Sequence, residues 1–151
     1  MTKQSAGILL YRNTQNEWEF FLVHPGGPFF KNKDAGYWTI PKGEYLEKED
    51  PLKAALREFE EETGIALTGN FKELISIKQK GGKTVKAWAI EKNIDTTTIK
   101  SNSFIIEWPP KSGKQQSFPE IDKGEWFNIA LAKEKMNKEQ FQFIEELLSS
   151  L

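Results

Sequence analysis

The spacing of apolar and polar residues predicts two neighbouring strands at the start of the chain. Residues 5–11 and 18–23 are short apolar runs, and the polar segment between them has the composition of a turn. The segment 25–36 opens with four glycine or proline residues and continues with polar ones, so we expect a long loop of the kind that often carries function. Residues 38–41 predict a short strand that ends at its proline.

The clearest helical pattern covers residues 50–64. Asp50 suits the N-cap, Pro51 suits the first helical position, and Gly64 suits the residue just after the helix. Inside this segment, apolar residues recur at helical spacing and predict a stripe that packs on the core: Leu52, Ala55, Leu56 and Phe59.

The second half of the chain predicts further strands and one more helix. Residues 71–80 and 83–92 flank a pair of glycines and predict a hairpin, and residues 104–108 predict a strand that two prolines end. Residues 111–124 are polar, so we expect a loop there. Residues 137–151 predict an amphipathic helix. Without repeats or linkers, the 151 residues are expected to form one mixed α/β domain, residues 1–151.

Composition and charge narrow the possible chemistry. The chain has 21 basic and 22 acidic residues, so its formal charge of −1 favours neither extended nucleic acid nor an anionic membrane. No apolar run is long enough to span a membrane, and the N-terminus lacks the apolar stretch of a signal peptide, so we expect a cytoplasmic protein. Cysteine is absent and His24 is the only histidine. Carboxylates, lysines and a recruited metal are therefore left to carry any chemistry.

The predicted helix 50–64 contains an arrangement of glutamates that stability alone does not favour. Four glutamates crowd its last two turns, where the helix dipole disfavours anions. Glu58, Glu61 and Glu62 fall within an arc of about 100°, and each like-charge pair costs a few tenths of a kcal/mol, which a divalent cation would reverse. Oxygen-only clusters suit Mg²⁺ or Mn²⁺. A solvated acidic face is the alternative interpretation of these residues taken alone.

A longer motif surrounds these glutamates. Residues 43–65 resemble the Nudix box, which is Gly, five residues, Glu, seven residues, then Arg-Glu-apolar-any-Glu-Glu-any-Gly-apolar. The matching positions are Gly43, Glu49, Arg57, Glu58, Phe59, Glu61, Glu62, Gly64 and Ile65. The resemblance implies the Nudix fold, a mixed β-sheet between helices in the α+β class. It also implies hydrolysis, dependent on Mg²⁺ or Mn²⁺, of a nucleoside diphosphate linked to another group.

The same resemblance implies roles for individual residues. It assigns the metal to Glu58, Glu61 and Glu62, joined by the backbone carbonyl of Gly43. Arg57 and Glu49 correspond to residues that orient these carboxylates. In related enzymes a glutamate in the loop before a Trp-containing segment supplies a fourth ligand or the general base, and Glu120 stands at that place. The carboxylates expected to act in catalysis are accordingly Glu58, Glu61 and Glu120.

Segments outside the box indicate a substrate class. Residues 5–12, 38–44, 83–88 and 119–127 look like parts of diadenosine polyphosphate hydrolases, which implies a dinucleoside polyphosphate such as diadenosine tetraphosphate. Nucleoside triphosphates, nucleotide sugars and the 5′ end of RNA remain alternative substrates. A non-catalytic Nudix domain that senses a ligand is an alternative of another class, and loss of box glutamates would mark it. None is lost here.

Lysines are the natural partners of substrate phosphates. Lys42 touches the box, and Lys83 and Lys86 lie on the predicted hairpin. His24 ends a predicted strand just before the 25–36 loop, where it either reaches a phosphate or packs. The expected partner is thus a small nucleotide, and the expected assembly is a monomer or a weak dimer.

Overall fold

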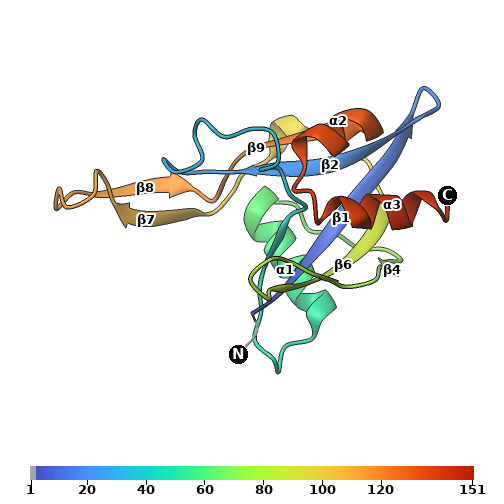
Figure 1. Ribbon diagram of the computed structural model, residues 1–151, viewed down its shortest axis with the longest axis horizontal. Helices are drawn as coiled ribbons and strands as arrows, with labels where there is room; N and C mark the ends of the chain where they lie inside the picture. The colour runs from blue at the N-terminus through green and yellow to red at the C-terminus, as the bar shows by residue number, and fades with distance from the viewer. Residues whose placement is uncertain (1–2) are drawn as a thin grey trace.

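The computed structural model describes residues 3–151 and contains a central sheet with helices on both faces (Figure 1). Its strands are β1 (Gln4–Thr14), β2 (Glu17–Pro25), β3 (Lys42–Glu44), β4 (Lys72–Glu73), β5 (Ile77–Lys78), β6 (Thr84–Glu91) and β9 (Ile121–Asn128). The order across the sheet is β4–β6–β1–β2–β9, while β3 pairs with β1 and β5 pairs with β6. β1 and β6 run parallel and the other pairs run antiparallel, so the predicted mixed sheet is confirmed.

Helices cover both faces of the sheet because its central strands alternate two sets of apolar side chains. The helices are α1 (Pro51–Thr63), α2 (Ile129–Lys135) and α3 (Phe141–Leu148), with a short 3₁₀ turn, η1 (Thr96–Thr98). On β2, Phe21 faces α1 and contributes with Phe59 to one core cluster. The neighbouring Phe20 faces the opposite way and shares the second cluster with Phe143 of α3. The expected sheet between helices is confirmed.

Several local predictions match the structure closely. β1 and β2 are joined by a two-residue turn in which Gln15 and Asn16 both have positive φ, as the tightest hairpin turns require. The predicted helix 50–64 is α1, with the expected N-cap and the expected left-handed glycine after it. The expected hairpin of residues 71–92 also forms, although its first arm consists of two short strands, β4 and β5.

Other expectations were wrong. Residues 38–41 form no strand, because Trp38 and Thr39 make only single bridges, to Met136 and Val23. The predicted loop 111–124 is largely β-structure: β8 (Gln115–Pro119) pairs antiparallel with β7 (Ser103–Glu107), and β9 follows directly. The sequence pattern did not indicate β8 because most of its side chains are polar. The strand forms because it pairs with β7, and this pairing does not depend on apolar side chains in β8.

The C-terminal region differs from its prediction in a similar way. The final helix is shorter than residues 137–151, and α2, which the sequence pattern did not indicate, precedes it. Asn128 caps α2 by accepting a hydrogen bond from the Leu131 N–H at 2.9 Å. In Figure 1 the β7–β8 hairpin extends away from the central sheet, beside the loop that follows β2. Within residues 3–151, no helix is long and apolar enough to cross a membrane.

Candidate active site

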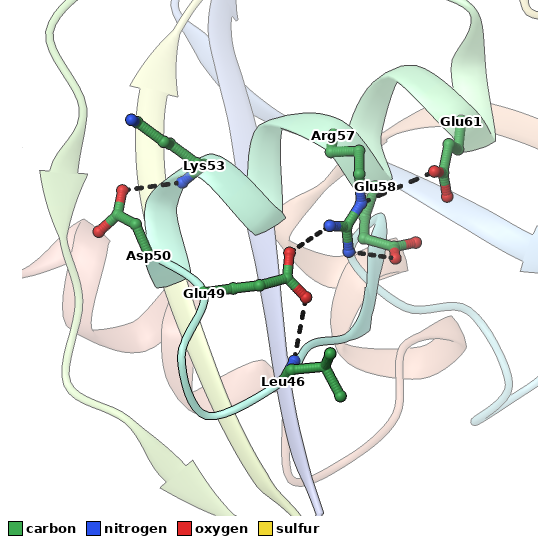
Figure 2. Close-up of polar contacts among 7 residues, drawn as sticks. All are labelled: Leu46, Glu49, Asp50, Lys53, Arg57, Glu58 and Glu61. Atoms are coloured by element: carbon green, nitrogen blue, oxygen red, sulfur yellow. Dashed lines mark hydrogen bonds and ion pairs between the residues drawn. The ribbon is translucent and has the colours of Figure 1, made fainter.

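Helix α1 places the box glutamates at the rim of the sheet. Asp50 accepts a hydrogen bond from the Lys53 N–H at 3.2 Å (Figure 2). Gly64, at φ 77°, ends the helix, and its N–H donates to the Glu60 carbonyl. Ala54, Ala55 and Phe59 are buried beneath the helix. Because one side of α1 is anchored in the core, the opposite side holds its carboxylates at a fixed position.

Arg57 organises the carboxylates on that exposed side. Its guanidinium pairs with Glu49 and lies 3.2 Å from Glu58 Oε1 and 3.7 Å from Glu61 Oε1 (Figure 2). Glu49 also accepts a hydrogen bond from the Leu46 N–H at 3.0 Å, which ties the loop before α1 to the same arginine. One side chain therefore connects three box carboxylates, the arrangement expected of an orienting residue.

Gly43 and Glu58 are packed so closely that any side chain at position 43 would displace the Glu58 carboxylate. A Cβ atom at this position would lie 2.1 Å from Glu58 Oε2 and 2.6 Å from Oε1. Gly43 is in β3, where it pairs with Ala6 of β1, so its backbone is held by the sheet. The Glu58 carboxylate consequently rests against the backbone of residue 43.

Glu120 joins this group from a distant part of the chain. The segment after η1 covers the last carbonyls of α1, since the Asn102 N–H donates to the Glu61 carbonyl at 2.8 Å. The Glu120 N–H donates in turn to the Asn102 carbonyl, and the Gly26 N–H donates to the Glu120 carbonyl, both at 2.8 Å. Glu120 therefore sits on a hydrogen-bonded link between β8 and β9 instead of in the long polar loop predicted for residues 111–124.

The four carboxylates repel one another. Burial raises the pKa of Glu62 to about 8, with further contributions from the charges of Glu58 and Glu120. Burial also raises the pKa of Glu58, where the charges of Glu61 and Glu120 oppose the hydrogen bond from Arg57. The pKa of Glu120 is raised by burial and by Glu61. These mutual effects show that Glu120 shares the electrostatic environment of the α1 glutamates.

This donor set fits a hard divalent cation. All of its side-chain donors are carboxylate oxygens, and a bound cation would relieve their mutual repulsion. Among residues 3–151, no three acidic or histidine side chains converge into a ready-made metal cage. Two of the four carboxylates, those of Glu58 and Glu61, form ion pairs with Arg57 instead.

Two of the three predicted phosphate-binding lysines lie next to each other. Burial and the neighbouring Lys83 cation lower the pKa of Lys42 to about 8, and Glu62 partly offsets this effect. Lys86 of β6 and Gly43 of β3 both pair with Ala6, so Lys86 stands on the α1 face of the sheet. Lys42 thus lies near Glu62 and Lys83 lies beside Lys42, while Lys86 shares only the face of the sheet that α1 covers.

His24 is not placed to bind a phosphate. It is only 3% exposed, and both of its ring nitrogens are engaged within the chain. Nδ1 lies 2.8 Å from Asp122 Oδ1, and Nε2 lies 2.6 Å from the Lys33 carbonyl. The packing role that the sequence left open is the one that the structure supports. Asp122 was missed because nothing in the sequence relates it to a histidine on another strand.

Comparisons with known proteins show which sequence family and which solved folds the chain resembles. The family model described as NUDIX domain matches residues 1–147. An Ap4A hydrolase from C. elegans has a similar structure, with a TM-score of 0.62 and 21% identity over 99% of this chain and 100% of that one. The NUDIX domain of NrtR from Shewanella oneidensis, solved with ADP ribose, gives a TM-score of 0.67 at 14% identity, covering 99% and 88%. No curated protein matches the sequence.

Proposed function

The chain belongs to the NUDIX family and is a hydrolase of phosphoric anhydride bonds, and we propose that its substrate is a dinucleoside polyphosphate such as diadenosine tetraphosphate. The reaction is assigned to α1 because Glu58 packs against Gly43 and the charge of Glu120 acts on both Glu58 and Glu62. Burial, together with the charges of neighbouring carboxylates, raises the pKa of Glu58, Glu62 and Glu120, so their ionised forms oppose folding.

In this proposal Glu58, Glu61, Glu62 and Glu120, together with the Gly43 carbonyl, hold a divalent cation, Mg²⁺ or Mn²⁺. When bound, that cation would neutralise phosphate charge and favour ionisation of the attacking water. The side chains have distinct tasks. Glu120 accepts the proton of the attacking water, which is a role that a carboxylate can take in general acid–base catalysis.

Neighbouring residues position these groups. Arg57 and Glu49 fix the carboxylates of Glu58 and Glu61, so that their oxygens need little reorganisation. The lysines at positions 42, 83 and 86 neutralise the substrate phosphates, and the proximity of Lys42 to Lys83 suits a group that carries several negative charges.

The choice of substrate rests on resemblance. The segments that look like diadenosine polyphosphate hydrolases lie both before and after the box, and the likeness to the C. elegans protein covers both chains almost completely. Nucleoside triphosphates, nucleotide sugars and RNA 5′ ends are the competing substrates, and ADP ribose bound to a structural neighbour keeps nucleotide sugars among them. A ligand-sensing role is disfavoured because every box glutamate is present.

A substrate panel tests this proposal. The protein is incubated with Mg²⁺ and, separately, diadenosine tetraphosphate, ATP, ADP ribose and a 5′-triphosphorylated RNA, and the products are separated by ion-exchange chromatography. We expect the highest kcat/KM for diadenosine tetraphosphate. A higher value for any other member would reassign the substrate, and the absence of turnover on every member would refute the proposed hydrolase.

A further inference from the structure

Ser101 lies in the segment between η1 and β7 and has no role in the chemistry above, yet its hydroxyl makes two hydrogen bonds. It donates to the Asn102 carbonyl at 2.8 Å and accepts from the Ile121 N–H at 3.0 Å. Both partners adjoin Glu120, one through a backbone hydrogen bond and the other as its neighbour in the chain. We propose that Ser101 is a positioning residue that orients Glu120 toward the α1 glutamates, an inference that rests on the proposed function.

Hydrogen bonds hold the peptide groups on both sides of the Glu120 Cα atom. On the preceding side, the Glu120 N–H donates to the Asn102 carbonyl at 2.8 Å. On the following side, the Glu120 carbonyl accepts from the Gly26 N–H at 2.8 Å, and the Ile121 N–H donates to Ser101 Oγ. Because a residue has only two soft backbone angles, these bonds set the direction of the Cα–Cβ bond of Glu120.

Ser101 contributes a side chain to this arrangement, whereas the other bonds that hold Glu120 join backbone groups. Its hydroxyl shares the Asn102 carbonyl with the Glu120 N–H, so it acts on both sides of Glu120. Ile121 is only 8% exposed, and its N–H therefore needs a hydrogen-bond partner. A substitution of Ser101 thus changes the surroundings of the Glu120 backbone without altering any of the clustered carboxylates.

The segment that carries Ser101 is also anchored to the end of α1. The Lys100 N–H donates to the Thr63 carbonyl at 2.9 Å. The Asn102 N–H donates to the Glu61 carbonyl at 2.8 Å. Ser101 lies between these two bonds, so its hydroxyl links the position of α1 to that of the proposed general base. This link matters for the rate, because a misplacement of about 1 Å in a catalytic arrangement can cost on the order of 100-fold.

Initial rates on diadenosine tetraphosphate with Mg²⁺ test this assignment. Ser101→Ala removes both hydrogen bonds of the hydroxyl, so we expect kcat to fall by about 10- to 100-fold, with KM changed by less than about threefold. A second pair of variants is matched in shape: Ser101→Thr keeps a hydroxyl and Ser101→Val lacks one. Ser101→Thr should restore most of the lost turnover, and Ser101→Val should not.

A double-mutant cycle distinguishes positioning of Glu120 from a general loss of active protein. In the Glu120→Gln background the general base is already absent, so Ser101→Ala should lower kcat further by less than about threefold. A purely structural role would produce the same loss in both backgrounds. The matched control is Ser117→Ala, which alters an exposed serine of β8, the strand that leads to Glu120. Its kcat should equal that of the wild type.

Thermal unfolding of each variant accompanies the rates. Wild-type kcat in Ser101→Ala, or equal kcat in Ser101→Thr and Ser101→Val, would overturn the positioning role. So would equal losses in the two backgrounds, a similar loss in Ser117→Ala, or a loss that matches the fraction of unfolded protein. An inactive wild type would instead overturn the proposed hydrolysis, and normal turnover in Glu120→Gln would overturn the proposed base.

Discussion

The variant Gly43→Ala is expected to displace a carboxylate of the site while leaving the stability of the fold almost unchanged. The new methyl group would lie 2.1 Å from the Glu58 carboxylate, whereas ordinary contact begins near 3.4 Å, so the carboxylate must retreat by about 1.3 Å. A misplacement of about 1 Å in a catalytic arrangement can cost on the order of 100-fold in rate. We therefore expect kcat on diadenosine tetraphosphate to fall by about that factor.

Stability should change little in the same variant. Gly43 is not among the glycines with positive φ, so alanine can adopt its backbone conformation. Replacement of glycine at such a position stabilises by about 0.4–1 kcal/mol through the unfolded chain, and displacement of a flexible side chain offsets part of this gain. The melting temperature should consequently stay within about 4 °C of the wild type.

The assay compares initial rates at saturating Mg²⁺ with thermal unfolding followed by circular dichroism. A double-mutant cycle with Glu58→Ala supplies the control, because Gly43→Ala has no carboxylate to displace in that background and should then add less than about a threefold effect. Wild-type turnover in Gly43→Ala, or an equally large loss in both backgrounds, would refute the reasoning.

Four further substitutions test other parts of the site. Glu62→Gln should raise the melting temperature without metal, because burial disfavours the charged carboxylate, and should lower kcat by about 100-fold or more; calorimetry and initial rates check both. Glu120→Gln should lower kcat by about 10²–10⁴-fold with little change in KM. The control variants Glu107→Gln and Glu125→Gln should retain activity. If a control variant loses activity while Glu120→Gln does not, the general base is a different carboxylate. Arg57→Lys should lower kcat by about 10- to 100-fold, because a lysine cannot bridge three carboxylates. The free energy of unfolding should change by less than about 1 kcal/mol, because these ion pairs are partly exposed. His24→Ala should cost about 2 kcal/mol or more in urea unfolding, because Asp122 and the Lys33 carbonyl lose their buried partner; an unchanged midpoint would contradict that role.

Local sequence information was sufficient to predict α1 and its glutamates. The cap at Asp50, the terminal glycine and the apolar stripe all act within a few residues, so a single segment encodes the helix and the direction of its carboxylates. The Gly43–Glu58 contact is also short in range, because β3 and α1 are close in sequence.

The rest of the site depends on pairings that no local pattern encodes. His24 and Asp122 are 98 residues apart, and only the pairing of β2 with β9 brings them together. Glu120 reaches α1 through the backbone of Asn102, which requires β8 to exist where the side chains are mostly polar.

Cation binding is the most direct test of the central claim that the clustered glutamates form a metal site. Binding of Mn²⁺ can be measured by electron paramagnetic resonance on the wild type, on the triple variant Glu58→Gln, Glu61→Gln, Glu62→Gln, and on Glu60→Gln. Glu60 is the matched control, since it is an exposed glutamate of the same helix outside the cluster. We predict that the wild type and Glu60→Gln bind Mn²⁺ equally and that the triple variant loses this binding. Equal binding by all three proteins, or none by the wild type, would contradict the account.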